Sequence, residues 1–459
     1  MRQLYRAILF VFIFFVVFSS ISFALSPETH ENINEFVAKN TLDVFLMDAY
    51  LQNQLGFENG VYEEIKGNYW VPFIRTTKPV WKWIKIGGRY EDKPPWVIPY
   101  LRSVNHFHDP LTEEGFSGFF FGLLLSGDSS VVWAQKPLGV QKPGGHYSWQ
   151  DARDYFYNAL TLTNKTDRDD NFAKTFRAMG QLMHLVEDVS VPAHVRNDGH
   201  LVGYEEWVGK NINISTISPI FFDKSIFDRP ISGLPIANIF DTNQYSGTNP
   251  NVTIGSYIGL SEFTNANFFS EDTIFNNYPH PAEENTTAQL VQQNAKDGQI
   301  DETWYIQGYT SQRLAAYSYF WNEGGVLINL GRWKYHLDDF VYSDYASQLI
   351  PRAVGYSAGL LDYFFRGTLD ITPPDQVAYS VTDGSVTPQQ FTSIKAKVRN
   401  TTPKGVDVDG NPLYEVMGAG SLVAVAKYKI IPNYSYDLSN YPPDASTMQT
   451  IENSYSVSA

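Results

Sequence analysis

Six of the nine histidines fall in three short stretches that are rich in polar and aromatic residues. In the densest stretch His184 and Asp188 stand four positions apart. On a helix they would share one face about one turn apart and could bind one metal ion together. Pro192 should end that helix and let His194 fold back from the next loop. A His and an Asp four positions apart on a helix are more often a capped or solvated pair than metal ligands. This spacing by itself therefore does not identify a metal site.

Further ligand-type residues stand upstream and downstream of this pair. Residues 105–110 read Asn-His-Phe-His-Asp-Pro, and in an extended segment His106 and His108 would face the same way. His108 is then either a partner that orients a ligand or an ordinary polar loop residue. The chain has no cysteine, so any metal site must use nitrogen and oxygen ligands. The other candidate ligands are His30, Asp92, His200 and Glu205.

In this order the stretches resemble the zinc-dependent phospholipases C and single-strand-specific nucleases, a mostly helical family with three zinc ions. The family pattern is an N-terminal His, Gly-x-x-Glu-Asp, Asn-His-Phe-x-Asp-Pro, His-x-x-x-Asp-x-x-x-Pro-x-His and a final His…Tyr-Glu. The resemblance extends over residues 25–367 and is poor in the segment after residue 211. The pattern stands here at His30 and at residues 88–92, 105–110, 184–194 and 200–205.

The resemblance implies up to three zinc ions with separate ligand sets. The first set would be Asp92, His106, His184 and Asp188. The second ion, close to the first, would be bound by Asp188 as a bridge, by His30, and by the free amine and carbonyl of Leu25. A water between these two ions would attack a phosphate ester, and Asp92 would orient or deprotonate that water.

The third set implied by the resemblance would be His194, His200 and Glu205. Family members commonly place the last two ligands four apart, whereas His200 and Glu205 are five apart. Either a loop carries His200, or Glu206 takes the role of Glu205, or the third ion is weakly bound. A second departure is Leu25, which stands where family members often have tryptophan.

The first 24 residues predict an exported protein. Two arginines precede an apolar run at residues 7–18, and a small-x-small triplet ends at Ala24. The run is shorter than the ~20 residues that a membrane-spanning helix needs, so we expect cleavage after Ala24 rather than a retained anchor. Cleavage would make Leu25 the N-terminus and would place the protein outside the cell, in the periplasm or on the cell surface.

The elements that must position these residues are mostly helical. Helical periodicity marks residues 149–162, 170–188 and 345–365, and Ser148 is a plausible N-cap. Residues 211–297 are rich in Asn, Thr, Ser and Gly and resemble long surface excursions. Their internal structure is not readable from the sequence.

After a proline pair at residues 373–374 the pattern changes to strands. We therefore expect a mainly α protein with three parts. A signal peptide would occupy residues 1–24, a phospholipase C/nuclease-like helical domain residues 25–368, and a small β module residues 369–459. The module has too few strands for a closed sandwich and is expected to be incomplete.

Charge and resemblance together narrow the function. Removal of the first 24 residues would take away two arginines and lower the net charge from −15 to −17, which excludes a general binder of nucleic-acid backbones. The resemblance implies hydrolysis of a phosphodiester, with phospholipid at a membrane surface ahead of single-stranded nucleic acid. The alternative from another class is a non-catalytic, zinc-stabilised cell-surface binding protein. No partner protein is identifiable from the sequence.

Overall fold

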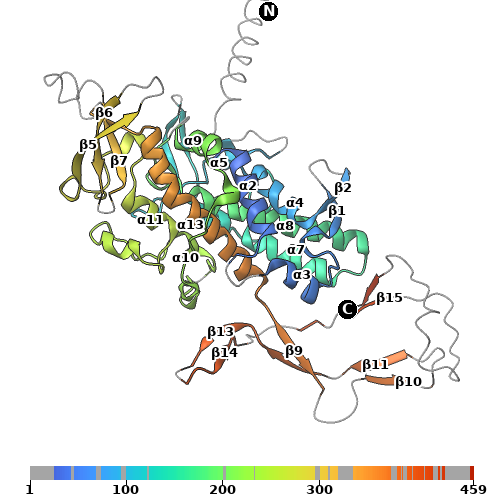
Figure 1. The fold of residues 1–459 in the computed structure, drawn as a ribbon. Helices are drawn as coiled ribbons and strands as arrows, with labels where there is room; N and C mark the ends of the chain where they lie inside the picture. Colours follow the sequence, from blue (N-terminus) through green and yellow to red (C-terminus); the bar gives the residue numbers. More distant parts are fainter. Residues whose placement is uncertain are drawn as a thin grey trace, which may run out of the picture. The chain divides into compact units, whose positions relative to one another are not determined.

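The computed structural model confirms a mostly helical chain with small sheets (Figure 1). Contacts among the described residues divide the chain into two compact units. The first comprises the described parts of Met1–Leu360 and Val425–Ala459, and the second comprises that of Leu361–Ala424. The residues described are 25–42, 46–68, 74–94, 100–120, 123–199, 203–231, 233–294, 300–308, 311–318, 334–373, 380–383, 385, 390–394, 396–407, 409–416, 422–423, 426–429 and 455–458.

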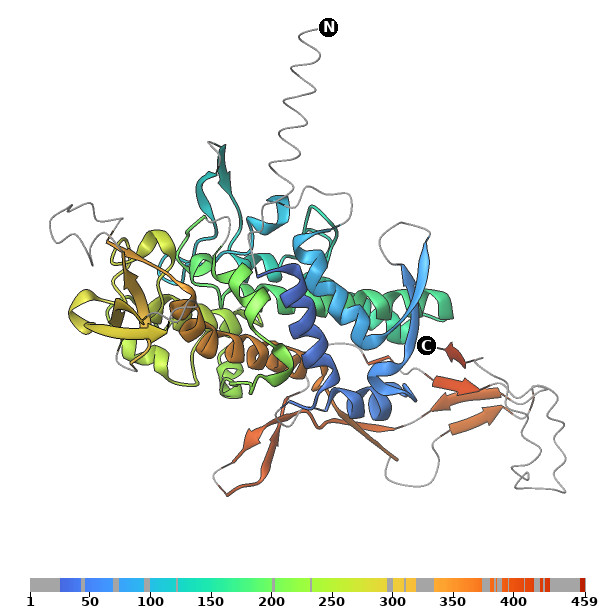
Figure 2. The same cartoon turned by 45° about the horizontal axis from the view of Figure 1, so that its top comes forward.

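Three long helices pack side by side in the first unit, as both ribbon views show (Figures 1 and 2). They are α2 (Pro27–Lys39), α4 (Val80–Asp92) and α8 (Lys165–Asp188). A fourth helix, α7 (Trp149–Thr161), packs along α8. The shorter helices of this unit are α3 (Met47–Leu55), α5 (Tyr100–Ser103), α6 (Ser130–Ala134), α9 (Tyr204–Asn211), α10 (Ala237–Phe240) and α11 (Leu260–Asn267).

Glycines let α4 and α8 approach each other backbone to backbone. A Cβ atom on Gly180 would lie 2.0 Å from the carbonyl oxygen of Ile84, and one on Gly87 would lie 2.3 Å from that of Arg177. These distances leave no room for a side chain, so the two glycines set the helix separation. The buried Asn34 of α2 fastens the contact by donating to Ile84 O (3.2 Å) and Gly180 O (3.0 Å).

The predicted helices agree with the structure apart from their ends. The side chain of Ser148 caps α7 by accepting from the Asp151 amide. Helix α8 starts five positions before the predicted residue 170 because Asn164 caps it, and its first turns are polar. It ends at Asp188, ahead of Pro192, which instead opens the 3-10 turn η2 (Pro192–Val195). The third predicted helix is α13 (Asp339–Phe365).

The segment that was expected to form long surface excursions contains short helices followed by a sheet, and the expectation is wrong where the helices are buried. Helices α10 and α11 lie in it, and the four-stranded antiparallel sheet β5-β6-β7-β8 begins near its end. Its strands are β5 (Thr287–Asn294), β6 (Ile300–Gln307), β7 (Arg313–Tyr317) and β8 (Tyr335–His336). The first unit also contains two strand pairs: β1 (Glu64–Asn68) with β2 (Arg75–Pro79), and β3 (Ser117–Phe120) with β4 (Leu123–Ser126).

The described C-terminal residues form short strand pairs. A turn closed between Asp407 and Asn411 joins two of them. Within the described residues no helix is long and apolar enough to span a membrane. The strands are β9 (Leu369–Thr372), β10 (Ser380–Asp383), β11 (Gln390–Ile394), β12 (Lys397–Asn400), β13 (Pro403–Val406), β14 (Pro412–Tyr414), β15 (Ala426–Lys429) and β16 (Tyr455–Ser458).

Candidate metal centre

Five predicted ligands from distant parts of the chain meet at the ends of the packed helices. Four of them have no exposed surface, and Asp92 keeps 5%. Two come from the C-terminal end of α8, one from the last residue of α4, one from α2 and one from the stretch after α5. We call this group the paired centre: His30, Asp92, His106, His184 and Asp188.

The first predicted ligand set is assembled around one oxygen of Asp188. Its Oδ2 lies 2.8 Å from Nδ1 of His106 and 3.0 Å from Nε2 of His184. Oδ1 of Asp92 lies 3.6 Å from each of the same two nitrogens. Separations near 3 Å between neighbouring ligand atoms suit a cation bound about 2 Å from each. The helical i, i+4 spacing therefore does bring His184 and Asp188 together.

The other oxygen of Asp188 faces a different imidazole. Its Oδ1 lies 3.3 Å from Nε2 of His30. The His30 ring stacks on the His184 ring with centroids 3.6 Å apart, so the two predicted ligand sets are adjacent. One carboxylate thus presents one oxygen to each group, which is the arrangement that a bridging ligand requires.

Hydrogen bonds behind the ligands fix which ring nitrogen faces inward. Nδ1 of His184 lies 2.7 Å from the carbonyl oxygen of Gly88, to which it must donate. Nδ1 of His30 lies 2.5 Å from Oε2 of Glu187, whose other oxygen accepts from the Ser357 hydroxyl (3.2 Å). In the neutral form of each ring, with the proton on Nδ1, Nε2 would direct its lone pair towards Asp188.

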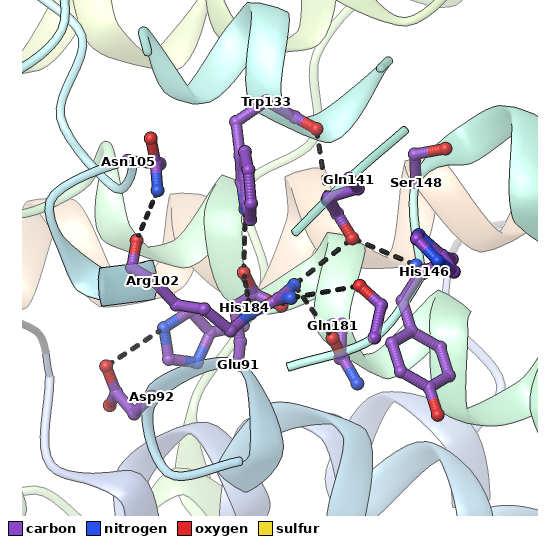
Figure 3. A network of polar contacts seen from close by, with 12 residues as sticks. Glu91, Asp92, Arg102, Asn105, Trp133, Gln141, His146, Ser148, Gln181 and His184 are labelled. Atoms are coloured by element: carbon purple, nitrogen blue, oxygen red, sulfur yellow. Dashed lines mark hydrogen bonds and ion pairs between the residues drawn. The ribbon is translucent and has the colours of Figure 1, made fainter. Parts of the chain in front are cut away.

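A buried ion pair lies behind the third imidazole, that of His106. Nη2 of Arg102 lies 2.6 Å from Oε2 of Glu91, and the Trp133 indole donates to the other oxygen of Glu91 (2.9 Å), as Figure 3 shows. That oxygen is 3.6 Å from Nε2 of His106, the nitrogen that faces away from Asp188. Burial opposes ionisation of Glu91, but the charges of Arg102 and His106 lower its pKa to about 2.

The charges of the centre act strongly on one another. Burial alone would lower the pKa of His30, yet the nearby carboxylates of Asp188 and Glu187 raise it to about 10. The pKa of His106 rises to about 9 in the same way, against burial and chiefly because of Asp188. Burial raises the pKa of Asp92, and nearby imidazoles only partly offset this. Without a metal, protons thus provide the positive charge that the carboxylates demand.

The residues present fit a divalent cation. Several of their buried polar atoms have no hydrogen-bond partner among the described residues, although burying such atoms is costly. These atoms belong to three converging side chains, and each atom can donate a lone pair to a metal ion. Coordination would satisfy all of them. These atoms are His30 Nε2, Asp92 Oδ2, Asp188 Oδ1 and Asp188 Oδ2.

The third predicted ligand set is only partly described. The His194 ring stacks on Phe107, and its Nδ1 lies 4.0 Å from Oδ1 of Asp188. Glu205 is buried at the start of α9 and lines a pocket together with Glu271 and Tyr342. His200 lies outside the described residues.

The N-terminal part of the second predicted set is placed next to the helices. Leu25 is fully buried and directly precedes Ser26, whose side chain caps α2 by accepting from the Thr29 amide. The predicted cleavage that would free the Leu25 amine follows Ala24, and residues 1–24 lie outside the described part of the chain.

Sequence reasoning missed the residues that hold the ligands. Glu187 and Glu91 each stand directly before a predicted ligand, and both are fully buried. The sequence did offer one signal for both, since each is a glutamate next to a predicted ligand in a tightly packed helix. A carboxylate buried there needs a hydrogen-bonding or charged partner. Arg102 gave no such signal, since its partners come from three separate parts of the chain.

Comparison of the chain with models of protein families, with curated proteins and with solved structures found no match.

Proposed function

We propose that this chain is an exported, zinc-dependent phosphoesterase that hydrolyses a phosphodiester at the paired centre. The observation that carries the proposal is the placement of Asp188, whose two oxygens face two separate imidazole groups. Two cations held side by side by one carboxylate are typical of phosphoester hydrolases. Zinc bound there would supply a water of lowered pKa as nucleophile and positive charge for the phosphoryl oxygens.

Asp92 is the residue that we assign to the attacking water. It is the one member of the paired centre with exposed surface, and its Oδ2 has no hydrogen-bond partner among the described residues. Burial also raises the pKa of its carboxyl group, which makes it a better proton acceptor than an ordinary aspartate. Its Oδ1 would remain directed towards His106 and His184.

The proposed substrate is a phospholipid rather than a nucleic acid. The exported chain would carry a net charge of −17, which follows from the loss of two arginines from a chain of −15. Such a surface repels a polyanion but has little net interaction with a zwitterionic headgroup. Only a local cationic centre then attracts the phosphate group.

The first experiment determines whether the metal centre exists as proposed. The exported protein is purified, its N-terminus is sequenced, and zinc is counted per chain. We expect Leu25 at the N-terminus and at least two zinc ions, because cleavage completes the second ligand set. One zinc ion or none per chain would overturn the proposal that the paired centre binds two zinc ions.

The second experiment determines the reaction. Hydrolysis is measured in parallel on phosphatidylcholine vesicles and on single-stranded DNA, with Asp92→Asn and with Asp167→Asn as matched control. Asp167 is an exposed residue in the first turn of α8, far along that helix from the centre. We expect phospholipid hydrolysis that Asp92→Asn abolishes without loss of zinc. Unchanged hydrolysis in Asp92→Asn would overturn its assigned role, and activity on DNA alone would overturn the substrate.

A non-catalytic zinc protein is the second candidate, and one observation favours it. The first ligand set has four protein ligands that are almost completely buried, as in structural zinc sites. That candidate predicts retained zinc, no hydrolysis of either substrate, and a large loss of thermal stability on chelation.

A further inference from the structure

A second group of metal-ligating side chains lies outside the paired centre. His108, Glu113 and Asp241 each offer one ligand atom, and these three atoms all lie within 4.8 Å of one another. None of the three belongs to the predicted ligand sets. His108 lies two residues from His106, yet its ring contacts Asp241 instead of the paired centre. We call this group the loop cluster.

The imidazole of the loop cluster is oriented as a ligand imidazole would be. The Ser129 hydroxyl lies 2.8 Å from Nδ1 of His108, and Oδ2 of Asp241 lies 2.8 Å from Nε2. His108 and Asp241 are almost completely buried. In metal sites an outer partner commonly binds one nitrogen of a ligand imidazole and fixes the ring, while the other nitrogen binds the metal. Here Ser129 would be the outer partner at Nδ1, and Nε2 would face the metal together with Asp241. The backbone amide of Asn243 binds the other oxygen of Asp241 (2.7 Å).

Glu113 is held towards this pair by an unusual backbone. Its φ is +61°, in the left-handed region that non-glycine residues rarely adopt. Hydrogen bonds close the turn around it, from the Glu113 amide to Asp109 O (2.8 Å) and from the Asp109 amide to Glu114 O (2.9 Å). Backbone strain of this kind persists where surrounding structure enforces it, and it clusters at ligand sites.

Negative charge accumulates at the loop cluster. Asp109 and Glu262 lie close enough to Glu113 to act on it, in addition to Asp241. Several carboxylates around a single imidazole are costly to bring together without a cation.

We propose that the loop cluster is a second divalent-cation site, with His108, Glu113 and Asp241 as its protein ligands. One nitrogen and carboxylate oxygens suit Zn²⁺ or Mn²⁺. Because Glu113 is exposed, the ion would face solvent on one side and could exchange. The site also touches the His194 segment, since the His108 amide donates to His194 O (2.9 Å).

The test counts ions in the full exported chain after chelation and reloading with Zn²⁺ or Mn²⁺. Glu113→Gln and Asp241→Asn are compared with the wild type and with Glu114→Gln, a matched control at the neighbouring exposed position. We expect each cluster variant to bind one ion fewer per chain than the wild type and the control. Circular dichroism checks folding, and Glu113→Gln should fold normally because its side chain is exposed.

The same comparison is repeated in chains that carry Asp188→Asn, so that the paired centre cannot account for the result. We expect the difference of one ion to persist there. Equal ion counts in cluster variants and control would overturn the proposal and leave Ser129, His108 and Asp241 as a hydrogen-bonded chain only. A difference that disappears with Asp188→Asn would overturn it too, because the lost ion would then belong to the paired centre.

Discussion

The paired centre and the loop cluster use similar side chains on different supports. In the paired centre the predicted ligands come mostly from three helices whose backbones touch, and outer hydrogen bonds hold His30 and His184. In the loop cluster the proposed ligands come from loops, and Glu113 is exposed. Ligands on packed helices cannot withdraw without moving the core, whereas a loop ligand can. The comparison therefore predicts tight retention at the first site and exchange at the second.

The largest effect is expected from Asp188→Asn. The amide removes the charge that both imidazole groups face, so zinc content should fall and phosphodiester hydrolysis should drop on the order of 10³-fold, as loss of metal-ion catalysis implies. Zinc analysis and steady-state kinetics measure this, with Asp167→Asn as control. Full zinc content with normal hydrolysis would show that Asp188 does not bridge.

Glu187→Gln and Ser129→Ala test the outer partners of the two sites against each other. Each removes or weakens the group that orients one imidazole, which typically reduces metal affinity about 10- to 100-fold. We expect Glu187→Gln to act only on the paired centre and Ser129→Ala only on the loop cluster. Competition with a chelator measures both affinities. If either variant weakened both sites equally, the two sites would not be independent.

Gly180→Ala tests the helix support of the paired centre. The new methyl group would lie 2.0 Å from Ile84 O, so α4 and α8 must separate. Overpacking of this kind costs about 1–3 kcal/mol of the free energy of unfolding, which denaturant titration measures. A matched control is Gly139→Ala, since a Cβ atom there meets nothing within 4 Å. Because Gly139 has φ +69°, an alanine there should also lower the free energy of unfolding somewhat. The close packing of α4 and α8 is supported if Gly180→Ala loses clearly more stability than Gly139→Ala.

The smallest effect concerns protons. In the metal-free chain His30 and His106 have pKa values raised to about 10 and 9. At pH 7.5 both rings are therefore protonated on both nitrogens and positively charged. Zinc needs their lone pairs, and loading of the paired centre should release about two protons. The same shifts stabilise the metal-free fold fully below pH 6.5, and this contribution is lost as the pH rises towards 9–10.

Calorimetry in buffers of different ionisation enthalpy measures the protons released. At the loop cluster the imidazole should contribute no proton, because burial lowers the pKa of His108 and its ring is neutral before loading. Protons released there would come from the carboxyl groups of Glu113 and Asp241, whose pKa values burial raises. His30→Gln should reduce the release by about one proton, whereas no change in that variant would show that His30 is neutral in the metal-free chain.

The sequence predicted which residues gather at the paired centre because part of the signal is local. The spacing of His184 and Asp188 needs only a helix, and the motif order of the resembling family added Asp92, His106 and His30. The loop cluster had no such signal, because His108 and Asp241 stand 133 positions apart and lie in loops without periodicity. The sheet after residue 286 was hidden for a related reason, since its first strand alternates poorly and is largely polar.

Both carboxylates of the first ligand set are the last residues of their helices, Asp92 in α4 and Asp188 in α8. At that end a helix presents unpaired carbonyl groups, which together amount to roughly half an elementary negative charge. A carboxylate in this position is normally unfavourable, and here two helix dipoles and two carboxylates converge. The backbone itself therefore favours a cation at this place, before any bond to a ligand atom is counted.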